Sequence, residues 1–300
     1  MSNFNSSPAV TDCIFKDNSA IDKGGGGMNN DNSKTMVKGC VFIANYAKRA
    51  GGMDNVNSIS PIVTNCIFTS NSVAFGGGGI GNNFNSGTIL IGCTFRNNVA
   101  NVNGGGMWNA NKSKPILNNC IFTGNTAKNN GGGMFNIDNS KPTVINCTFS
   151  SNMASQSGGG IFNKNSGPIV ANCILWNNRD SGGRNLFAQT SSNVGKPRIN
   201  YSCIQGGGHR LGGIGNISKA PGFISERGSD NSIGTTDDNL RLRDSSPCID
   251  AGKNAALSKD TADLDNDGDK NEQIPFDIDG NQRIVNDRVD MGAYEFQSTP

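Results

Sequence analysis

Apolar residues recur along residues 1–180 with a period of about 27 residues. Each repeat has a Cys with an aliphatic residue three positions before it, and six of the seven repeats have a Phe two positions after it. The cysteines are Cys13, Cys40, Cys66, Cys93, Cys120, Cys147 and Cys173. A fixed period of this length is typical of solenoids, in which each unit packs only on its neighbours.

The residue before each Cys predicts a bend between two strands. The Cys and the Phe are two positions apart and therefore point to the same face of a strand. The aliphatic residue lies an odd number of positions away, so the chain must turn before the Cys if all three side chains point inward. The turning position holds only Asp, Gly or Asn, which adopt left-handed backbone conformations at low cost. A second corner is expected at the Asn three residues after each Phe position, from Asn18 to Asn178.

A glycine phrase supplies a third corner. It ends at Met28, Met53, Ile80, Met107, Met134 and Ile161. Three short strands per turn at a constant period predict an all-β fold, a parallel β-helix of about seven to eight coils over residues 1–203. Coils about 4.8 Å apart would stack like residues into a Cys row, a Phe row and Asn ladders. Residues 204–300 do not repeat, and we expect them to form a loop-rich C-terminal cap over the last coil.

The seven repeat cysteines are expected to be inward-facing, reduced thiols. Stacked neighbours have parallel Cβ vectors nearly 5 Å apart, whereas a disulfide requires Cβ atoms about 3.8 Å apart. Cys203 and Cys248 lie outside this row, and the sequence leaves open whether they pair with each other.

Charge is unevenly distributed, although the net charge is only +2. Residues 1–180 hold 13 Lys+Arg and 7 Asp+Glu, whereas residues 181–300 hold 13 and 17. The basic residues neither cluster nor alternate with aromatic residues, so no nucleic-acid partner is expected. No apolar run approaches the length of about 18 residues that a transmembrane helix needs, and the polar start Met-Ser-Asn-Phe-Asn shows no signal peptide.

The tail carries an ordered series of short motifs. They are Tyr201-Ser-Cys-Ile-Gln-Gly-Gly, Gly215-Asn-Ile-Ser-Lys-Ala-Pro-Gly-Phe, Leu240-Arg-Leu-Arg-Asp-Ser-Ser-Pro-Cys-Ile-Asp-Ala-Gly, Asp277-Ile-Asp-Gly-Asn-Gln-Arg-Ile-Val and Val289-Asp-Met-Gly-Ala-Tyr-Glu-Phe. This series resembles the tail of secreted bacterial right-handed parallel β-helix repeat proteins of the choice-of-anchor Q type. The resemblance covers nearly the whole chain. It implies a right-handed helix and a secreted or surface-anchored protein, although this sequence shows neither signal nor anchor.

The repeats are also similar to those of the chlamydial polymorphic outer-membrane adhesins. The shared hallmark Phe-x-x-Asn stands six times, from Phe15/Asn18 to Phe149/Asn152. This sequence differs from the second hallmark of those adhesins, Gly-Gly-Ala-Ile/Leu/Val, because it has Gly-Gly-Gly-Met or Gly-Gly-Gly-Ile at that place.

Catalytic groups are scarce on the predicted strands. Glycoside hydrolysis usually needs two carboxyl groups within about 5–10 Å, and between residues 24 and 179 the acidic residues are Asp31, Asp54 and Asp138. We therefore favour a non-enzymatic, secreted or cell-surface protein for adhesion or glycan binding. The outward-facing candidates for stacking on sugar rings are Trp108 and Trp176.

Two alternatives remain open at this point. One is a polysaccharide lyase or glycoside hydrolase with its site near the last coils. Its catalytic candidates are Arg179, Asp180, Arg184, His209 and Arg210. The other is a structural element whose uncapped N-terminal coil docks end to end on another chain.

An acidic loop is the strongest local motif. In Asp263-Leu-Asp-Asn-Asp-Gly-Asp-Lys-Asn-Glu, carboxylates at positions 1, 3 and 5 and Gly at 6 copy the first half of an EF-hand-like calcium loop. Position 12 is Ile274 instead of the bidentate Glu, with Asp277 nearby, and a solvated acidic turn is the alternative. The candidate ligands for a structural calcium ion are Asp263, Asp265, Asp267, Asp269 and Glu272.

Overall fold

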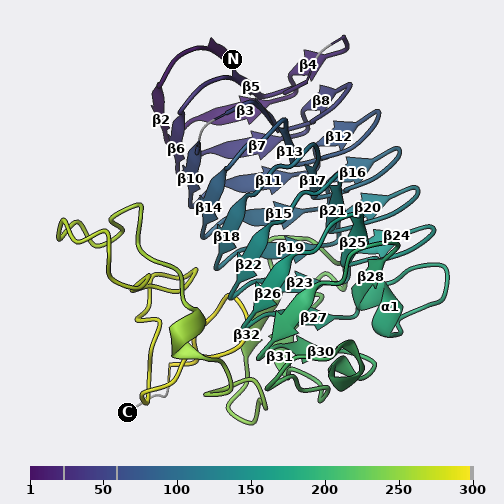
Figure 1. The fold of residues 1–300 in the computed structure, drawn as a ribbon, viewed down its shortest axis with the longest axis vertical. Coiled ribbons are helices and arrows are strands. Elements are labelled where there is room, and N and C mark those ends of the chain that lie inside the picture. Colours follow the sequence, from purple (N-terminus) through teal and green to yellow (C-terminus); the bar gives the residue numbers. More distant parts are fainter. Residues whose placement is uncertain (23, 59, 298–300) are drawn as a thin grey trace.

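Residues 2–204 form a parallel β-helix, as the repeat predicts (Figure 1). The computed structural model describes residues 1–22, 24–58 and 60–297, without the side chain of His209. We number the coils one to seven by their cysteine, from Cys13 to Cys173. Strands of successive coils pair in parallel, so that each sheet takes one strand from each coil it includes.

Four sheets, named A to D, form the walls of the helix. Sheet A follows the glycine phrase and contains β1 (Ser2–Phe4), β5 (Met28–Asp31), β9 (Met53–Val56), β13 (Ile80–Asn83), β17 (Met107–Asn109), β21 (Met134–Ile137), β25 (Ile161–Lys164) and β28 (Thr190–Ser192). Sheet B precedes the cysteines and contains β2 (Ala9–Thr11), β6 (Met36–Lys38), β10 (Ile62–Thr64), β14 (Ile89–Ile91), β18 (Ile116–Asn118), β22 (Thr143–Ile145), β26 (Ile169–Ala171) and β29 (Arg198–Asn200).

The other two sheets follow the cysteines. Sheet C contains β3 (Ile14–Lys16), β7 (Val41–Ile43), β11 (Ile67–Thr69), β15 (Thr94–Arg96), β19 (Ile121–Thr123), β23 (Thr148–Ser150), β27 (Ile174–Trp176) and β30 (Cys203–Ile204). Sheet D contains β4 (Ser19–Ala20), β8 (Tyr46–Ala47), β12 (Ser72–Val73), β16 (Val99–Ala100), β20 (Thr126–Ala127) and β24 (Met153–Ala154). The expectation of three strands per coil was wrong for coils one to six, because two-residue strands are too short to produce an alternating sequence pattern.

The remaining elements are short. They are the helix α1 (Leu186–Gln189), the 3-10 helices η1 (Gly208–Leu211) and η2 (Asn254–Ala256), and an antiparallel pair, β31 (Phe223–Ser225) and β32 (Asn239–Leu242). Asn185 caps α1, and its side-chain oxygen accepts hydrogen bonds from the backbone N–H groups of Phe187 and Ala188.

The first predicted corner is confirmed and the second lies one residue earlier than expected. Every residue that precedes a repeat Cys has a positive φ, between 49° and 63°. At the second corner the positive φ belongs to the residue before the Asn, at Asp17, Ala44, Ser70, Asn97, Gly124, Ser151 and Asn177. The Asn itself is therefore not the turning residue, and its side chain is free to point into the helix.

The core consists of stacked rows of identical or similar side chains. Phe15, Phe42, Phe68, Phe95, Phe122 and Phe149 form a continuous stack with ring centroids 4.4–4.9 Å apart and interplanar angles of 2–7°. This spacing equals the distance between neighbouring strands, so the stack needs no adjustment of the backbone. The row of Met and Ile residues that ends the glycine phrases lines the same core.

The cysteine row matches its prediction in six of seven coils. Cys40 to Cys173 are buried and unbonded, whereas Cys13 is exposed because no coil packs on its outer side. Ser202, not Cys203, continues the row, and its hydroxyl accepts a hydrogen bond from the backbone N–H of Cys173 at 3.1 Å. Cys203 and Cys248 are both buried free thiols in a second cluster under the tail, so they form no disulfide.

The three glycines of a phrase each occupy a position that excludes a side chain. In coil four, Gly104 has φ +69°, which L-residues rarely adopt. A Cβ on Gly105 would lie 2.4 Å from the carbonyl oxygen of Gly132, and one on Gly106 would lie 2.8 Å from the Phe122 ring. The phrase therefore allows close approach of neighbouring coils and makes room for the Phe stack.

Two buried asparagine ladders connect the coils. In the first, Asn18, Asn45, Asn71, Asn98, Asn125, Asn152 and Asn178 each donate from the side-chain amide to the next side chain at 2.8–2.9 Å, and Gln189 of α1 ends the series. In the second, on sheet A, the side-chain amides of Asn3, Asn30, Asn55, Asn82, Asn109 and Asn136 donate in the same way at 2.8–3.1 Å, ending at Asn163.

Asn98 illustrates how fully a ladder residue is satisfied. Its Oδ1 accepts from the backbone N–H and the Nδ2 of Asn71. Its Nδ2 donates to Asn125 Oδ1 and to the carbonyl oxygen of Phe68. Buried amides are stable only when they are paired in this way.

Replacing Asn98 with Ala should lower the free energy of unfolding by roughly 3–5 kcal/mol. The buried backbone N–H and Nδ2 of Asn71 lose Asn98 Oδ1 as their acceptor, and the Phe68 carbonyl oxygen and Asn125 Oδ1 each lose one donor. Asn101→Ala, at an exposed position of the same coil, should change it by less than about 0.5 kcal/mol. Urea unfolding followed by circular dichroism measures both. Equal effects of the two substitutions would show that the ladder is not a main source of stability.

The tail does more than cover the last coil. After β30 the chain turns back along the outside of the helix (Figure 1). It packs over the corner between sheets B and C in coils five to seven, and it reaches coil four at the corner between sheets C and D, where Asn97 donates to the carbonyl oxygen of Gly234. There the corner residues Asn119, Asn146 and Asn172 donate side-chain hydrogen bonds to carbonyl oxygens of Phe276, Asp290 and Lys253. The same corner holds Asp12, Gly39 and Gly92 in coils one, two and four. The tail thus packs on the Asn corners of coils five to seven, whereas Asn65, the corresponding residue of coil three, is exposed.

A buried arginine joins the last two tail motifs. Arg283 is 1% exposed, and its guanidinium donates to the carbonyl oxygens of Asp290, Gly292 and Ala293. The Arg283 Nε lies 3.7 Å from Glu295 Oε2. Burial raises the pKa of Glu295 to about 8, and the charge of Arg283 opposes that rise.

Replacing Arg283 with Ala should destabilise the tail by roughly 3–5 kcal/mol, because it leaves buried carbonyl oxygens and a buried carboxylate without a partner. Arg241→Ala should cost about 1 kcal/mol, because Arg241 pairs with Asp279 at a largely exposed site. Hydrogen exchange of residues 240–295 and urea unfolding report the two effects. A cost for Arg283→Ala no larger than that for Arg241→Ala would contradict the structural role assigned to Arg283.

Candidate functional site

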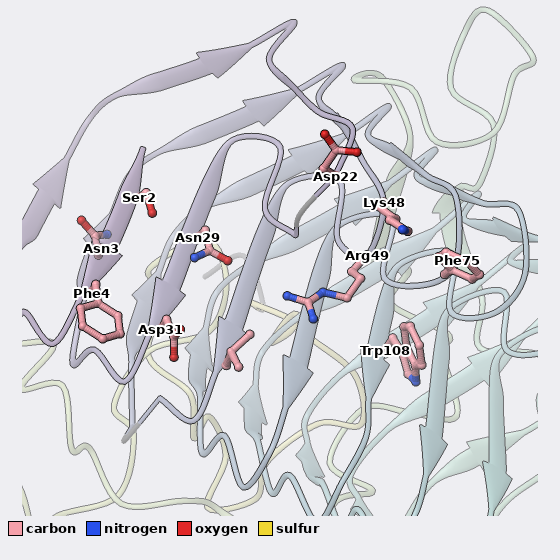
Figure 2. A pocket seen from close by; sticks show the side chains of 11 residues that line it. Ser2, Asn3, Phe4, Asp22, Asn29, Asp31, Lys48, Arg49, Phe75 and Trp108 are labelled. Atoms are coloured by element: carbon pink, nitrogen blue, oxygen red, sulfur yellow. The ribbon is translucent and has the colours of Figure 1, made fainter.

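A groove of about 780 Å³ crosses the outer face of sheet A over the first four coils (Figure 2). The strands β1, β5, β9 and β17 contribute to its floor, and the loops between sheets D and A form one side. Its lining residues are Ser2, Asn3, Phe4, Asp22, Asn29, Asp31, Lys48, Arg49, Val56, Phe75 and Trp108. The groove combines aromatic rings with cationic, anionic and amide side chains.

Trp108 lies in this groove, on the outer face of sheet A, and its role in ligand binding stays a prediction. It pairs in register with Gly81, which in turn pairs with Asp54, so no side chain separates Trp108 from Asp54 along this row of sheet A. A Cβ on Gly76 would lie 2.6 Å from the indole ring, so the ring rests on the backbone of the preceding loop. Phe75, 47% exposed, lines the groove beside Trp108 (Figure 2).

Asp54 is a buried carboxyl group at the edge of the groove. Its side chain has no exposed surface, and Arg49 Nη2 lies 3.3 Å from its Oδ2 without hydrogen-bond geometry. Burial raises the pKa of Asp54 to about 6, and the nearby Arg49 opposes this rise. Asp31 lies on the neighbouring strand β5, two positions beyond the residue that pairs with Asp54, and its negative charge adds to the rise in the pKa of Asp54.

Trp176 has different surroundings. It is half-buried against the apolar cluster beneath the tail and lies beside Pro221 and Phe223. Its role in ligand binding stays a prediction.

The candidate residues of the last coils are separated from one another. Both carboxylate oxygens of Asp180 accept backbone N–H groups, from Gly158 and Gly182. Arg179 is exposed on the sheet D side, and Arg184 lies near Glu226. Arg210 lines a different hollow, beside Phe187. The side chain of His209 lies outside the described part of the structure, and catalysis at this end stays a prediction.

The first coil exposes apolar side chains at its outer edge. Ile14 is 72% exposed and Phe4 is 69% exposed. End-to-end docking through this coil stays a prediction.

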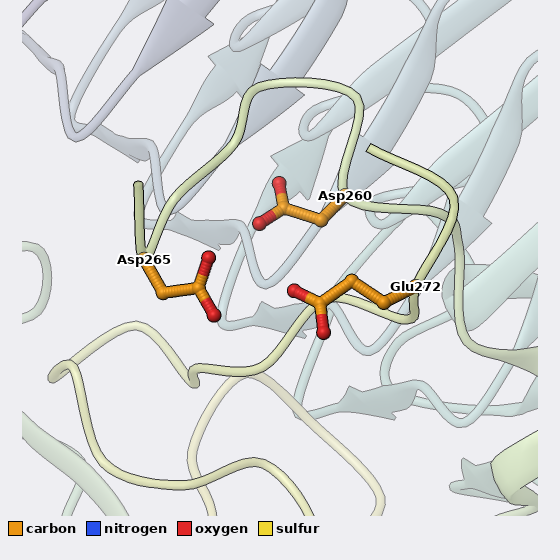
Figure 3. A group of neighbouring side chains, drawn as sticks. All are labelled: Asp260, Asp265 and Glu272. Carbon is orange, nitrogen blue, oxygen red and sulfur yellow. The ribbon is translucent and has the colours of Figure 1, made fainter. Parts of the chain in front are cut away.

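The acidic loop brings its carboxylates together in two overlapping groups. One group consists of Asp260, Asp265 and Glu272 (Figure 3), and another of the motif residues Asp263, Asp265 and Asp267. Asp269 belongs to neither group. Burial raises the pKa of Asp260, and burial together with the charges of Asp265 and Asp267 raises the pKa of Glu272.

The residues that complete both sites carry no periodic or motif signal in the sequence. Asp260 precedes the Asp-x-Asp-x-Asp-Gly motif by three residues and enters its group only because the loop closes. Arg49 and Phe75 lie in loops of variable sequence. Phe75 carries a local signal only, as an aromatic residue directly before a run of four glycines.

The comparison with known proteins identifies a similarity in one repeat of the helix. A family model for the Chlamydia polymorphic membrane protein (Chlamydia_PMP) repeat matches residues 146–164. This segment contains Phe149 of the core stack together with Asn152 and Asn163 of the two ladders. No curated protein and no solved structure matches the chain. The match suggests a cell-surface repeat protein and rests on residues that stack the coils, not on residues of the groove.

Among the described residues, no helix is long and apolar enough to cross a membrane.

Replacing Asp54 with Asn should remove a pH dependence of stability. Between pH 3.8, the ordinary pKa, and about 6, the folded state retains a proton that the unfolded chain has released, so the native protein loses stability as the pH rises. Relative to the Asp54→Asn variant, the free energy of unfolding of the native protein should fall by up to about 3 kcal/mol between pH 4 and pH 7. Thermal unfolding at several pH values checks this, with Asp22→Asn, at an exposed groove position, as control. Parallel pH profiles for the native protein and Asp54→Asn would contradict the assignment.

Proposed function

We propose that this protein is a non-enzymatic cell-surface β-helix that binds a glycan in the groove over coils one to four. The observation that carries the proposal is the placement of Trp108 and Phe75 in one groove with Arg49 and Lys48. A sugar ring has an apolar face and a rim of hydroxyl groups. Aromatic rings pack against the first, and charged or amide groups bind the second.

The groove supplies both kinds of contact. Phe75 is an exposed ring, and Trp108 is held against the backbone of Gly76. Farther along the same groove lie hydroxyl, amide and carboxylate groups from Ser2, Asn29 and Asp31, on the two neighbouring strands β1 and β5 of sheet A (Figure 2). A volume of about 780 Å³ is within the range of small-molecule sites and accommodates a short oligosaccharide segment.

The surface location is supported by the repeat match and by the resemblance of the tail to secreted or surface-anchored β-helix proteins. A long rigid solenoid suits this role, because a groove built on stacked strands keeps its shape without an induced fit.

Replacing Trp108 with Ala should weaken glycan binding by about tenfold or more, because a stacking contact of 1–2 kcal/mol is lost. Phe75→Ala should act in the same direction and, at an exposed position, should leave the fold intact. The matched control is Phe84→Ala, which removes a phenylalanine of the same 47% exposure that does not line the groove. A glycan array with the full chain would select the ligand, and titration calorimetry would then measure the variants.

Three outcomes would reject the proposal. One is a glycan array without binding above background, and another is unchanged affinity in both Trp108→Ala and Phe75→Ala. The third is release of cleaved products from the bound glycan, which would make the protein an enzyme.

A further inference from the structure

We propose that a calcium ion binds between Asp260, Asp265 and Glu272, at the base of the acidic loop 260–272. These residues each offer a carboxylate oxygen, and the three oxygens lie within 4.8 Å of one another (Figure 3). Calcium binds oxygen ligands at about 2.3–2.6 Å, so one ion between the carboxylates reaches all three.

The second observation is a buried carboxylate oxygen without a partner. Asp260 has no exposed surface, and its Oδ2 accepts from the backbone N–H of Leu264 at 2.7 Å. Its Oδ1 has no hydrogen-bond partner, and neither has the buried Oε1 of Glu272. An unpaired buried carboxylate is costly, whereas hydrogen bonding or a bound cation removes that cost. Among the described residues, no Lys or Arg forms an ion pair with this group.

The backbone places the three carboxylates before any ion is present. The N–H of Asp260 donates to the carbonyl oxygen of Glu272 at 2.9 Å, and Lys259 and Gln273 form an antiparallel bridge beside it. These contacts close the loop at its two ends. They bring Asp260 and Glu272 opposite each other although twelve positions separate them in the sequence.

The ion is assigned to this group in preference to the overlapping group of Asp263, Asp265 and Asp267. In that second group Asp263 Oδ1 already accepts from the N–H of Gly268 at 3.1 Å, and Asp267 Oδ1 accepts from the N–H of Asp269 at 2.7 Å. Asp265 is common to both groups. The oxygens without partners therefore lie at Asp260 and Glu272.

The donor set favours a hard divalent cation. All donors are carboxylate oxygens, with no His or Cys among them, which is typical of calcium and magnesium sites. An irregular loop suits calcium, because calcium tolerates variable coordination whereas magnesium requires near-octahedral geometry. A bound ion would also secure the adjacent Ile274, which is buried in the tail.

Titration of the chelator-treated full chain with calcium chloride tests the proposal, with magnesium chloride as competitor. Calcium should bind and raise the melting temperature, and hydrogen exchange should slow in residues 250–295 while residues 40–90, which lie away from the tail contacts, stay unchanged. Asp260→Asn and Asp265→Asn should each weaken calcium binding by roughly tenfold or more. The matched control Asp269→Asn removes a carboxylate of the same loop that lies outside the group, and it should change affinity by less than about twofold.

Asp265→Asn keeps the test valid if Asp260→Asn fails to fold, because Asp265 lies on the loop and not in the buried base. Absence of calcium binding to the native chain would overturn the proposal, as would unchanged affinity in Asp265→Asn. Loss of binding in Asp267→Asn but not in folded Asp260→Asn would place the ion in the other group and would equally overturn the assignment.

Discussion

The stacking of equivalent coils at the spacing of β-strands is the constraint on which the rest of this structure depends. It forces each inward side chain to lie on a copy of itself, so only residues that tolerate such contact can occupy the core. Phenylalanine rings do so face to face at 4.4–4.9 Å. Asparagine does so because its amide donates to one neighbour and accepts from the other, which pairs both polar atoms of a ladder side chain such as that of Asn98.

The groove arises where the outward row of sheet A departs from uniformity. Along that row, Asp54, Gly81 and Trp108 follow one another in register, so an ionisable group, a gap and an aromatic ring lie side by side. The inward rows of the same coils continue unchanged. A solenoid can thus vary its surface without cost to its core, because the two faces of each strand hold independent sets of side chains.

The tail is held in place by a different kind of contact from the one that stacks the repeats. It has no periodic neighbour to stack on, and it is held by specific polar contacts: the corner asparagines Asn119, Asn146 and Asn172 on the helix, and the buried Arg283 within the tail itself. Such contacts require an exact partner for each donor. The acidic loop has the same character, with a buried oxygen of Asp260 that the polypeptide leaves unmatched.

The sequence by itself determined the β-helix, its coil boundaries, the first corner and the inward rows, because a period of about 27 residues leaves a strong pattern at Cys, Phe and Asn. It did not reveal the two-residue strands of sheet D, the exposure of Cys13 or the return of the tail to coil four. Those depend on contacts between residues far apart in the chain, as when Asn97 meets Gly234. The same holds for the sites. The position of Trp108 was readable from its place after Met107, whereas Arg49, Phe75 and Asp260 join their groups only through loop conformations that no repeat encodes. Periodic positions are set by their neighbours one coil away, but a loop side chain is placed by tertiary packing alone.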